Sequence, residues 1–531
     1  MNLIAVSIEI EPGSDPRELL DRVRLASANG AALVEWRIDQ VADEPGAVEL
    51  IRQLVRESPV PVILTCRPAW EGGSYQGNDQ DRVALIEACS LDDAAPRYVD
   101  FELAAYDRSA NIRQKIDLVV DHPAQVRDIK ASLILSSHDM DGRPADLTRR
   151  IETMMDMESC SVVKIAWHAR SVRDNLEAFE LLRQRRKPMV ALCMGPFGLM
   201  SRVLAPKFGG LFTFASESED SATAPGQQTI ETMRSLYRYD SIGSATRVYG
   251  IIGWPVEHSL SPLLHNTVFD QVQHDGVMVR MPVPPEWEHF KATLASVLDY
   301  GDLDLSGASV TMPHKTHLLR FISERGGQVD PIAEIAGAAN TLVIGDDGVP
   351  GCINTDAPGL VHALKQGLSS GGSDLSDARV TVLGSGGMAR AAAAGLLREG
   401  SRVTLACRSP ESARQLKVLM GDSIESITID EIDTGSFDVL INCTPVGMSG
   451  GEDPDSSPLP ADVGLDDSST VMDTIYTPMH TPLLVSAAES GARVITADGL
   501  FIRQAELQSR AWLDSEPPTG LMDRVFRSAS P

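Results

Sequence analysis

Hydrophobic positions in the first 240 residues form short runs that recur at regular intervals. Apolar or β-branched stretches begin at Leu3, Leu33, Pro61, Tyr98, Ser132, Ser161, Pro188 and Gly209. Most of the intervening segments, such as residues 15–30, carry the spacing of an amphipathic helix. Eight strand–helix units in succession predict a (β/α)₈ barrel, a TIM barrel. A doubly wound sheet is the alternative, but eight consecutive units favour closure.

The pattern changes after the polar stretch SIGSAT at residues 241–246. This composition favours a flexible connection, although an ordinary loop within one domain has the same composition. We predict a barrel domain over residues 1–240 and an α/β domain over 247–360. A Rossmann-like domain is expected over 376–499, and residues 500–531 are expected to pack back on the 247–360 domain. The predicted fold is therefore α/β throughout, a barrel fused to a two-domain dehydrogenase.

Composition narrows the range of partners. With 43% hydrophobic and 23% charged residues in 531, the chain has the composition of a globular protein. The net charge of −27 argues against nucleic acid or anionic membrane as a partner, and no run reaches the roughly 18 apolar residues of a membrane helix. Seven cysteines without a CxxC pair indicate neither a disulfide framework nor a metal site. We therefore expect no metal and a reducing cytoplasm.

Polar side chains stand late in the predicted barrel strands. Glu35 and Arg37 end the second strand, Arg67 ends the third and His138 ends the fifth. Barrel enzymes build their sites at this end of the strands. Glu71, four residues after Arg67, is placed to orient His138 as an acid/base, although a lone pair of this kind is more often structural.

Lys164 lies inside the apolar strand VVKIA. Burial favours the neutral form of an amine, which can attack a carbonyl and form a Schiff base. A lysine paired with a strand carboxylate, such as Glu35 or Glu102, is the alternative. Arg202 and the loop at residues 223–227 follow the seventh and eighth strands, where barrels often bind anions.

The second half also places polar residues at strand ends. Ser259 and Ser261 stand before a predicted helix, where they suit a carboxylate ligand or plain N-capping. Further along the chain come Thr311, Lys315, Asn340 and Asp356.

Residues 378–400 read as a strand, a glycine turn and an alanine-rich helix. Gly384, Gly386 and Gly387 allow the backbone to approach a pyrophosphate at the helix N-terminus. The spacing GxGGxxR is a variant of the usual fingerprint, and glycine turns alone give false positives. The flanking strand and helix favour a dinucleotide site.

The end of the next strand predicts which nicotinamide cofactor binds. An NAD site places an acid there for the ribose 2′-hydroxyl, but this strand ends in Cys407, Arg408 and Ser409. Arg408 suits a 2′-phosphate, Ser409 adds a hydroxyl, and Arg414 is a further candidate. A solvated loop arginine is the alternative. We predict NADP.

The barrel motifs together resemble type I 3-dehydroquinate dehydratase. They are EWRID, TCRPAWEGG, SSHDM, VVKIA, MGPFGLMSRVLAPKFGG and APGQ, in the family's order. The resemblance implies that Lys164 forms an imine with the substrate ketone. His138, supported by Glu71, would remove the α-proton and later protonate the departing hydroxyl. The implied substrate-binding residues are Glu35, Arg37, Arg67, Arg202, Gln227 and Thr223, the last standing where the family commonly has Ser.

The second half resembles shikimate dehydrogenase through HSLSP, VTMPHK, GAANTL, NTD, GSGGMAR, NCTPVGM and DTIYTPMHTPLL. The resemblance implies a catalytic pair, Lys315 and Asp356. Implied substrate-binding residues are Ser259, Ser261, Thr311, Asn340, Tyr476 and Gln504. Implied cofactor-binding residues are Gly384, Ser385, Gly386, Gly387, Met388, Ala389, Arg408, Ser409 and Thr444. Ser309 replaces a common Asn, and Ala357-Pro358 stiffens the turn after Asp356.

Together the halves resemble the fused dehydratase–dehydrogenase of the shikimate pathway. The resemblance implies dehydration of 3-dehydroquinate to 3-dehydroshikimate and reduction of that product with NADPH. Its partners would be these small molecules. One alternative is a Schiff-base aldolase joined to a dehydrogenase. Another is a transcriptional regulator that binds the metabolites without turnover, which the acidic charge disfavours. Activity on quinate and the oligomeric state stay open.

Overall fold

The chain forms two compact units in the computed structural model, which describes residues 2–90, 94–122, 129–345, 347–369, 375–513 and 515–529. The first unit comprises residues 1–247 together with 275–282 and 296–304. The second comprises residues 248–274, 283–295 and 305–531. No helix among the described residues is long and apolar enough to cross a membrane.

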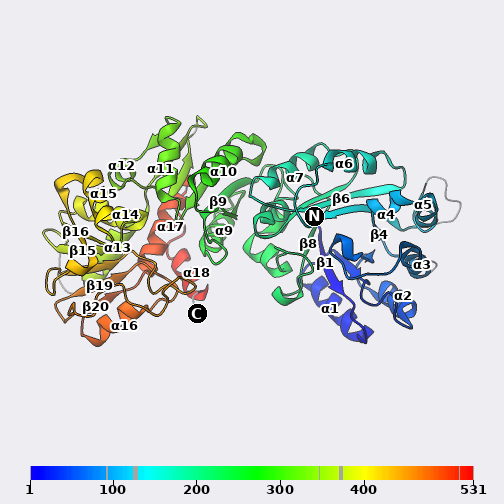
Figure 1. The fold of residues 1–531 in the computed structure, drawn as a ribbon, viewed down its shortest axis with the longest axis horizontal. Helices are drawn as coiled ribbons and strands as arrows, with labels where there is room; N and C mark the ends of the chain where they lie inside the picture. The colour runs from blue at the N-terminus through cyan, green and yellow to red at the C-terminus, as the bar shows by residue number, and fades with distance from the viewer. Residues whose placement is uncertain are drawn as a thin grey trace. The chain divides into compact units, whose positions relative to one another are not determined.

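Eight parallel strands form the barrel of the first unit, in the sheet order β7-β6-β5-β4-β3-β2-β1-β8 (Figure 1). The strands are β1 (Ile4–Glu9), β2 (Leu33–Arg37), β3 (Val62–Thr65), β4 (Tyr98–Glu102), β5 (Ser132–Asp139), β6 (Cys160–His168), β7 (Met189–Met194) and β8 (Thr213–Ala215). Strand β8 pairs with β1, and the backbone N–H of Leu211 donates to Met189 O of β7 at 2.9 Å. The predicted barrel is confirmed, and a doubly wound sheet is excluded.

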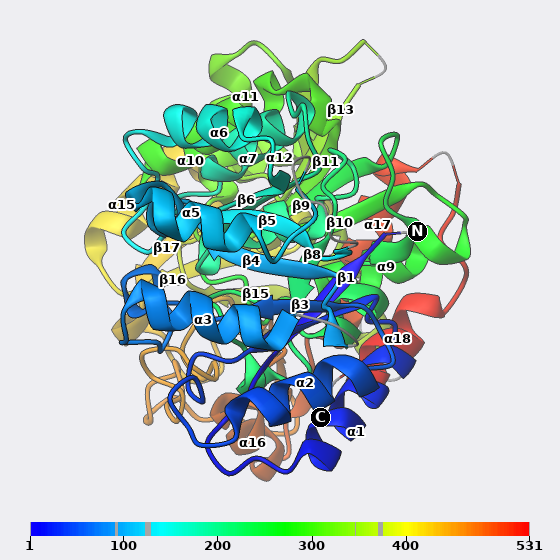
Figure 2. The ribbon, with the colours of Figure 1, turned by 90° about the vertical axis from the view of Figure 1, so that its right-hand side faces the viewer.

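Helices follow the strands around the outside of the barrel. They are α1 (Pro16–Ala28), α2 (Ala47–Glu57), α3 (Asp79–Ser90), α4 (Leu103–Arg108), α5 (Ala110–Asp117), α6 (Leu147–Asp156), α7 (Asp174–Arg183) and α8 (Leu199–Val203). Figure 2 shows α2, α3 and α5 along the outer face of the strands. Helix α1 illustrates the local cause: the Asp15 carboxylate caps its N-terminus, Pro16 opens it, and Leu19, Leu20 and Val23 turn inward.

The chain between residues 232 and 241 does not form a regular α-helix. The structure has a π-helix at Thr232–Leu236 and a 3₁₀ turn at Tyr239–Ser241. Arg238 between them has a φ of 52°, a left-handed conformation that interrupts helical hydrogen bonding.

The first sheet after residue 246 has the order β10-β9-β11-β13-β14-β12. Its strands are β9 (Arg247–Gly253), β10 (Gly276–Pro282), β11 (Leu305–Val310), β12 (Gln328–Val329), β13 (Thr341–Ile344) and β14 (Pro350–Ile353). Its helices are α9 (Ser261–Gln271), α10 (Trp287–Asp299), α11 (Lys315–Glu324), α12 (Pro331–Ala336) and α13 (Asp356–Ser369). Because β13 pairs antiparallel with both β11 and β14, the sheet is mixed.

The last sheet is parallel, with the Rossmann order β17-β16-β15-β18-β19-β20. Its strands are β15 (Arg379–Leu383), β16 (Arg402–Cys407), β17 (Ile424–Thr428), β18 (Val439–Asn442), β19 (Thr470–Asp473) and β20 (Arg493–Ile495), and its helices are α14 (Gly387–Arg398), α15 (Pro410–Met420) and α16 (Pro482–Glu489). Ala391, Ala392 and Ala393 of α14 are fully buried, because small side chains let the helix approach the sheet closely.

The C-terminal helices are α17 (Asp498–Trp512) and α18 (Leu521–Ala529). Helix α17 contacts α9, β11 and β13, and α18 contacts α9 and α17. Within the expected 500–531 segment, residues 514, 530 and 531 lie outside the described residues.

The Ala357-Pro358 pair, which we expected to stiffen a turn after Asp356, lies in the first turn of helix α13. Proline is tolerated there because first-turn N–H groups have no partner within the helix. Ala357 is fully buried, and its carbonyl lies 3.0 Å from where a Cβ on Gly395 would stand. The small Ala357 side chain therefore suits the close packing of α13 on α14.

Candidate active sites

All nine side chains predicted for the barrel site line one cavity. They are Glu35, Arg37, Arg67, Glu71, His138, Lys164, Arg202, Thr223 and Gln227. Ser7, Gly72, Met140, Ala166 and Phe214 are among the lining residues that the sequence did not indicate. The cavity lies at the carboxyl ends of the barrel strands, where the parallel arrangement brings these side chains together.

Lys164 is held by carboxylates inside the barrel. Its Nζ lies 2.8 Å from Asp100 Oδ2 and 3.5 Å from Glu35 Oε1, and it stands 4.3 Å from the centre of the Phe214 ring. Of the two carboxylates considered from the sequence, Glu35 is a partner and Glu102 is not. Asp100 was missed, although the alternation of β4 places it on the same face as Glu102.

His138 contacts Glu71 directly. The Nδ1 of the ring lies 2.9 Å from Glu71 Oε2, which also accepts the backbone N–H of His138 at 3.0 Å. Burial, followed by Arg67 and Lys164, holds the pKa of His138 well below its ordinary value. Burial and then the Glu102 carboxylate raise the pKa of Glu71 to about 8. A carboxyl group whose pKa is raised thus touches an imidazole whose pKa is lowered.

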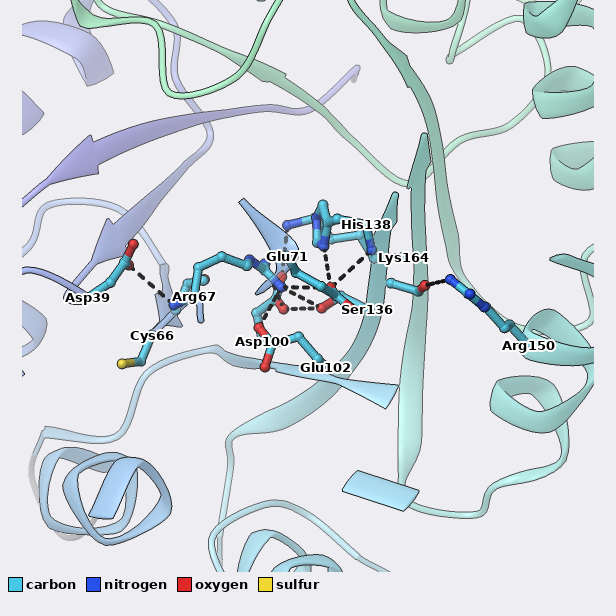
Figure 3. Close-up of polar contacts among 12 residues, drawn as sticks. Asp39, Cys66, Arg67, Glu71, Asp100, Glu102, Ser136, His138, Arg150 and Lys164 are labelled. Atoms are coloured by element: carbon cyan, nitrogen blue, oxygen red, sulfur yellow. Dashed lines mark hydrogen bonds and ion pairs between the residues drawn. The ribbon is translucent and has the colours of Figure 1, made fainter. Parts of the chain in front are cut away.

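Arg67 lies at the centre of the polar network that Figure 3 shows. Its Nη1 bonds to Glu102 Oε1 at 2.7 Å and to Ser136 Oγ at 2.8 Å, and its Nη2 lies 3.0 Å from Asp100 Oδ1. Burial alone would raise the pKa of Asp100, but Arg67 and Lys164 outweigh it and lower that pKa. Asp100 is therefore an anion that bridges the arginine and the lysine.

Arg202 is a buried cation that lacks a carboxylate. Its side chain is 2% exposed, its Nε has no hydrogen-bond partner, and Nη2 reaches only Pro225 O, at 3.4 Å. No ion pair joins it to any acid in the described part of the chain, and burial lowers its pKa to about 10. Thr223 and Gln227 close the loop beside it through hydrogen bonds of 2.9 and 3.3 Å. An unpaired guanidinium lining a cavity is suited to an anionic ligand.

The second unit brings Lys315 and Asp356 together. Lys315 begins α11 and Asp356 begins α13, and Lys315 Nζ lies 2.7 Å from Asp356 Oδ2. The two side chains are largely buried, so the ammonium and the carboxylate form an ion pair that is mostly shielded from solvent.

A buried amide network connects other predicted substrate residues. Asn340 Nδ2 donates to Thr355 Oγ1 at 2.9 Å and to Gln504 Oε1 at 3.4 Å. Thr355, one residue before Asp356, was missed, as was Gln508, whose amide donates to Ser309 and Thr341. The four-residue spacing of Gln504 and Gln508 on one helix was the available signal.

The remaining predicted substrate residues make local contacts of their own. Ser259 precedes α9 and Ser261 opens it, with the Ser261 N–H 3.3 Å from Ser259 Oγ. Thr311 follows β11 and lies close to Gly253. A Cβ added to Gly253 would stand 2.3 Å from Thr311 Cγ2. Tyr476 stacks near Phe501 of α17, with ring centres 4.7 Å apart.

The glycine turn between β15 and α14 fits a dinucleotide phosphate. Gly384 has a φ of +118° and lies against Cys443 and Thr444, and space is open around Gly386. No side chain caps the N-terminus of α14, so its N–H groups are left for an anion. Ser385 accepts a bond from Arg390 Nε at 3.1 Å, while Met388 and Ala389 form the first turn.

Lys315 also touches this turn. A Cβ on Gly387 would stand 2.7 Å from Lys315 Cβ, and Lys315 Nζ lies 3.9 Å from Met388 Sδ. Lys315 and the glycine turn are therefore adjacent.

The end of β16 presents a free guanidinium. Arg408 is exposed and has no ion-pair partner among the residues that the structure describes. Ser409 caps α15 by accepting from Ser412 N at 3.2 Å, and Arg414 is paired with Glu411 at 2.7 Å. An exposed guanidinium of this kind is suited to a phosphate group.

Fold and site together define a (β/α)₈ barrel enzyme joined to a Rossmann-type dehydrogenase. Three family models match: type I 3-dehydroquinase over residues 4–244, shikimate dehydrogenase substrate binding domain over 251–342, and shikimate/quinate 5-dehydrogenase over 367–447. The chain belongs to the family of bifunctional 3-dehydroquinate dehydratase/shikimate dehydrogenases.

This assignment rests on a relative that spans both halves. The chloroplastic bifunctional enzyme of Arabidopsis thaliana is 34% identical over 511 residues, which cover 94% of this chain and 80% of the relative. A shikimate dehydrogenase (NADP(+)) of Methanocella arvoryzae is 37% identical over 286 residues, 53% of this chain and 98% of the relative. Among solved structures, the S. pombe dehydroquinate dehydratase and shikimate dehydrogenase covers 99% of this chain and 98% of its own, at 22% identity and a TM-score of 0.42.

Proposed function

We propose that the first unit dehydrates 3-dehydroquinate to 3-dehydroshikimate and that the second reduces this product to shikimate with NADPH. The observation that carries the proposal is one cavity that holds a buried lysine, a His138–Glu71 pair and the unpaired Arg202. These are a candidate nucleophile, an acid/base and an anion receptor.

In the barrel, Lys164 Nζ attacks the ketone carbon of the substrate, and the oxygen leaves as water when the imine forms. His138 removes the proton from the neighbouring carbon, and electrons flow into the imine to give an enamine. When the enamine returns to the imine, the β-hydroxyl departs with a proton from His138, and hydrolysis frees Lys164. Arg202 holds the substrate carboxylate. The substrate hydroxyl groups are held by Glu35, Arg37, Arg67, Thr223 and Gln227.

In the second unit, Lys315 donates a proton to the carbonyl oxygen of 3-dehydroshikimate, and Asp356 orients its ammonium. Ser259 and Ser261 bind the carboxylate, and Thr311, Asn340, Tyr476 and Gln504 position the ring. The cofactor supplies the hydride when it is bound.

NADP is the proposed cofactor, as the printed names of the dehydrogenase relatives also say of those proteins. The open space at Gly386, the uncapped N-terminus of α14 and the free Arg408 support it. The residues proposed to hold it are Gly384, Ser385, Gly386, Gly387, Met388, Ala389, Arg408, Ser409 and Thr444.

We also propose domains over residues 1–240, 247–360 and 376–499, with 500–531 completing the second. A cytoplasmic location is proposed as well, and the seven free cysteines support a reducing compartment. Cell fractionation that placed the chain in an oxidising compartment would contradict this location.

A coupled assay tests the proposal. Supplied with 3-dehydroquinate and NADPH, the native chain is expected to consume NADPH, and borohydride is expected to fix the substrate on Lys164. Lys164→Ala should abolish both effects, yet consume NADPH when 3-dehydroshikimate is supplied directly. His138→Ala should still trap the imine but turn over about 10² to 10⁴ times more slowly. If Lys164→Ala consumed NADPH from 3-dehydroquinate at the native rate, the imine mechanism would be contradicted.

A further inference from the structure

Two charged residues outside the cavity wall hold Arg67 in place. Glu102 of β4 and Arg82 of α3 are both fully buried, and neither lines the cavity. Glu102 Oε1 accepts from Arg67 Nη1 at 2.7 Å, and its other oxygen, Oε2, accepts from Arg82 Nη1. Glu102 therefore bridges a cavity arginine and an arginine of the surrounding helix.

Arg82 is itself fixed on three sides. Its Nη1 donates to Cys66 O at 3.1 Å, its Nη2 donates to Asp79 at 3.1 Å, and its guanidinium lies 4.4 Å from the centre of the Phe101 ring. Cys66 immediately precedes Arg67, so Arg82 holds both the backbone and, through Glu102, the side chain at this end of β3. Figure 3 shows Cys66, Glu102 and Asp100 around Arg67.

Stability alone gives a weak reason for such a network. Buried ion pairs lose so much hydration that apolar residues of the same volume often serve the fold as well or better. What charged residues supply here is a fixed orientation and a fixed charge beside the reacting groups.

That charge acts on the His138–Glu71 pair. Arg67 Nη1 lies 3.9 Å from Glu71 Oε2, so any change at Glu102 reaches the pair through one guanidinium. The charged groups that face the pair come from β2, the end of β3, β4 and β6: Glu35, Arg37, Arg67, Asp100, Glu102 and Lys164. The Glu102 carboxylate, after burial, is the largest influence that raises the pKa of Glu71.

We infer that Glu102 and Arg82 are positioning residues for the dehydration: they fix the Arg67 guanidinium against the cavity and set the charge beside the His138–Glu71 pair. The inference rests on the proposed dehydratase function of the barrel. It adds that this function extends one layer beyond the residues that line the cavity.

Glu102→Gln tests the charge. It keeps the shape but leaves an amide N–H₂ facing one of two arginines, and it removes a negative charge from beside Glu71. The pH–rate profile of dehydration is expected to move to lower pH by on the order of one unit. The KM for 3-dehydroquinate is expected to rise, because Arg67 loses one anchor.

Arg82→Lys tests the orientation. It keeps the positive charge but replaces the planar fork, whose Nη1 meets Cys66 O and Glu102 and whose Nη2 meets Asp79, with a single nitrogen. We expect the native pH–rate profile with a raised KM.

Tyr106→Phe is the matched control, since it removes buried bonds to Asp117 and Ser159 in the same barrel without touching Arg67. It should lower the melting temperature and leave both readouts unchanged.

The melting temperature at which dehydratase activity disappears reports folding of the barrel in every sample. If Glu102→Gln folds and keeps the native pH–rate profile and the native KM for 3-dehydroquinate, the inference is overturned. It is also overturned if Tyr106→Phe shifts the profile and the KM as much as Glu102→Gln does. If Glu102→Gln does not fold, the Arg82→Lys variant tests the inference instead. An unchanged KM for 3-dehydroquinate in Arg82→Lys would then overturn the inference. Failure of the native chain to form an imine would instead contradict the proposed function.

Discussion

At the scale of single residues, burial and neighbouring charges give similar side chains opposite properties. Asp100 and Glu71 are both buried carboxylic acids of the barrel site. Two cations lower the pKa of Asp100, whereas burial and Glu102 raise that of Glu71 to about 8. Asp100 therefore stays an anion beside Lys164, and Glu71 can carry a proton beside His138. Carboxyl groups with separated pKa values are a common sign of divided acid/base roles.

Arg408 determines the expected choice of cofactor. It is exposed at the end of β16 and is not engaged in an ion pair with any described residue. Arg408→Asp should weaken NADP binding by one to two orders of magnitude, because the planar cation that meets the 2′-phosphate is replaced by an anion. Fluorescence titration with NADP and NAD measures both affinities. The assignment fails if the two fall equally, and Arg414→Ala, which alters an arginine already paired with Glu411, is the control.

Gly387 leaves room for Lys315. An added Cβ would meet Lys315 Cβ at 2.7 Å and Cδ at 3.1 Å, so Gly387→Ala must displace the lysine stem. We expect roughly a tenfold or greater loss of dehydrogenase kcat, since misplacement of a catalytic group is costly. Gly386→Ala is the matched control: its Cβ enters open space, where it should weaken NADP binding instead. Unchanged kcat in Gly387→Ala would contradict this role.

At the scale of elements, α17 shows how one helix attaches to a sheet through residues at four-residue spacing. Gln504, Gln508 and Trp512 lie on one face. Gln504 accepts from Asn340, Gln508 donates to Thr341, and Trp512 Nε1 donates to Leu342 O at 2.9 Å. His265 of α9 bonds to Gln508 and Ser509 and is fully buried. A helix far along the chain thereby completes the substrate-binding sheet.

His265 makes this attachment sensitive to acid. Burial lowers its pKa to about 4 from an ordinary value near 6.5. The unfolded state therefore takes up a proton first, and the stabilisation that is fully present above pH 6.5 is lost as the pH falls toward about 4. The melting temperature at which dehydrogenase activity disappears should fall between pH 7 and pH 5. In His265→Gln, which cannot titrate, the fall should be smaller. An identical fall in both proteins would count against His265.

At the scale of the whole molecule, the first compact unit extends past the end of the barrel sequence. Arg238 Nη1 donates to Gly276 O at 3.1 Å, Arg280 Nη1 donates to Tyr237 Oη at 3.3 Å, and Arg183 pairs with Asp302. These contacts all lie within the unit that contains residues 275–282 and 296–304.

A truncation after residue 247 should separate activity from stability. Fragment 1–247 keeps every residue that lines the barrel cavity, so it should still trap an imine with borohydride. It lacks residues 275–282 and 296–304 of its own compact unit, so its melting temperature should lie several degrees below that of the dehydratase in the full chain. Equal melting temperatures would show that those segments add nothing to the barrel.

The sequence by itself determined the architecture and most of the site chemistry. Strand repeats and the glycine turn are local patterns, because side-chain periodicity follows from backbone geometry. They were sufficient for eight barrel strands and a Rossmann sheet. The nine residues that line one cavity were predicted with the help of the resemblance to the dehydratase family.

Only the tertiary structure decided which of these residues meet. Asp100 bonds to Lys164 across 64 positions of sequence because β4, β5 and β6 are neighbours in the barrel. Arg82 enters the network from an outer helix, and Lys315 meets Gly387 through the packing of separate sheets and helices. Such contacts depend on distances between elements, which no local pattern in the chain encodes.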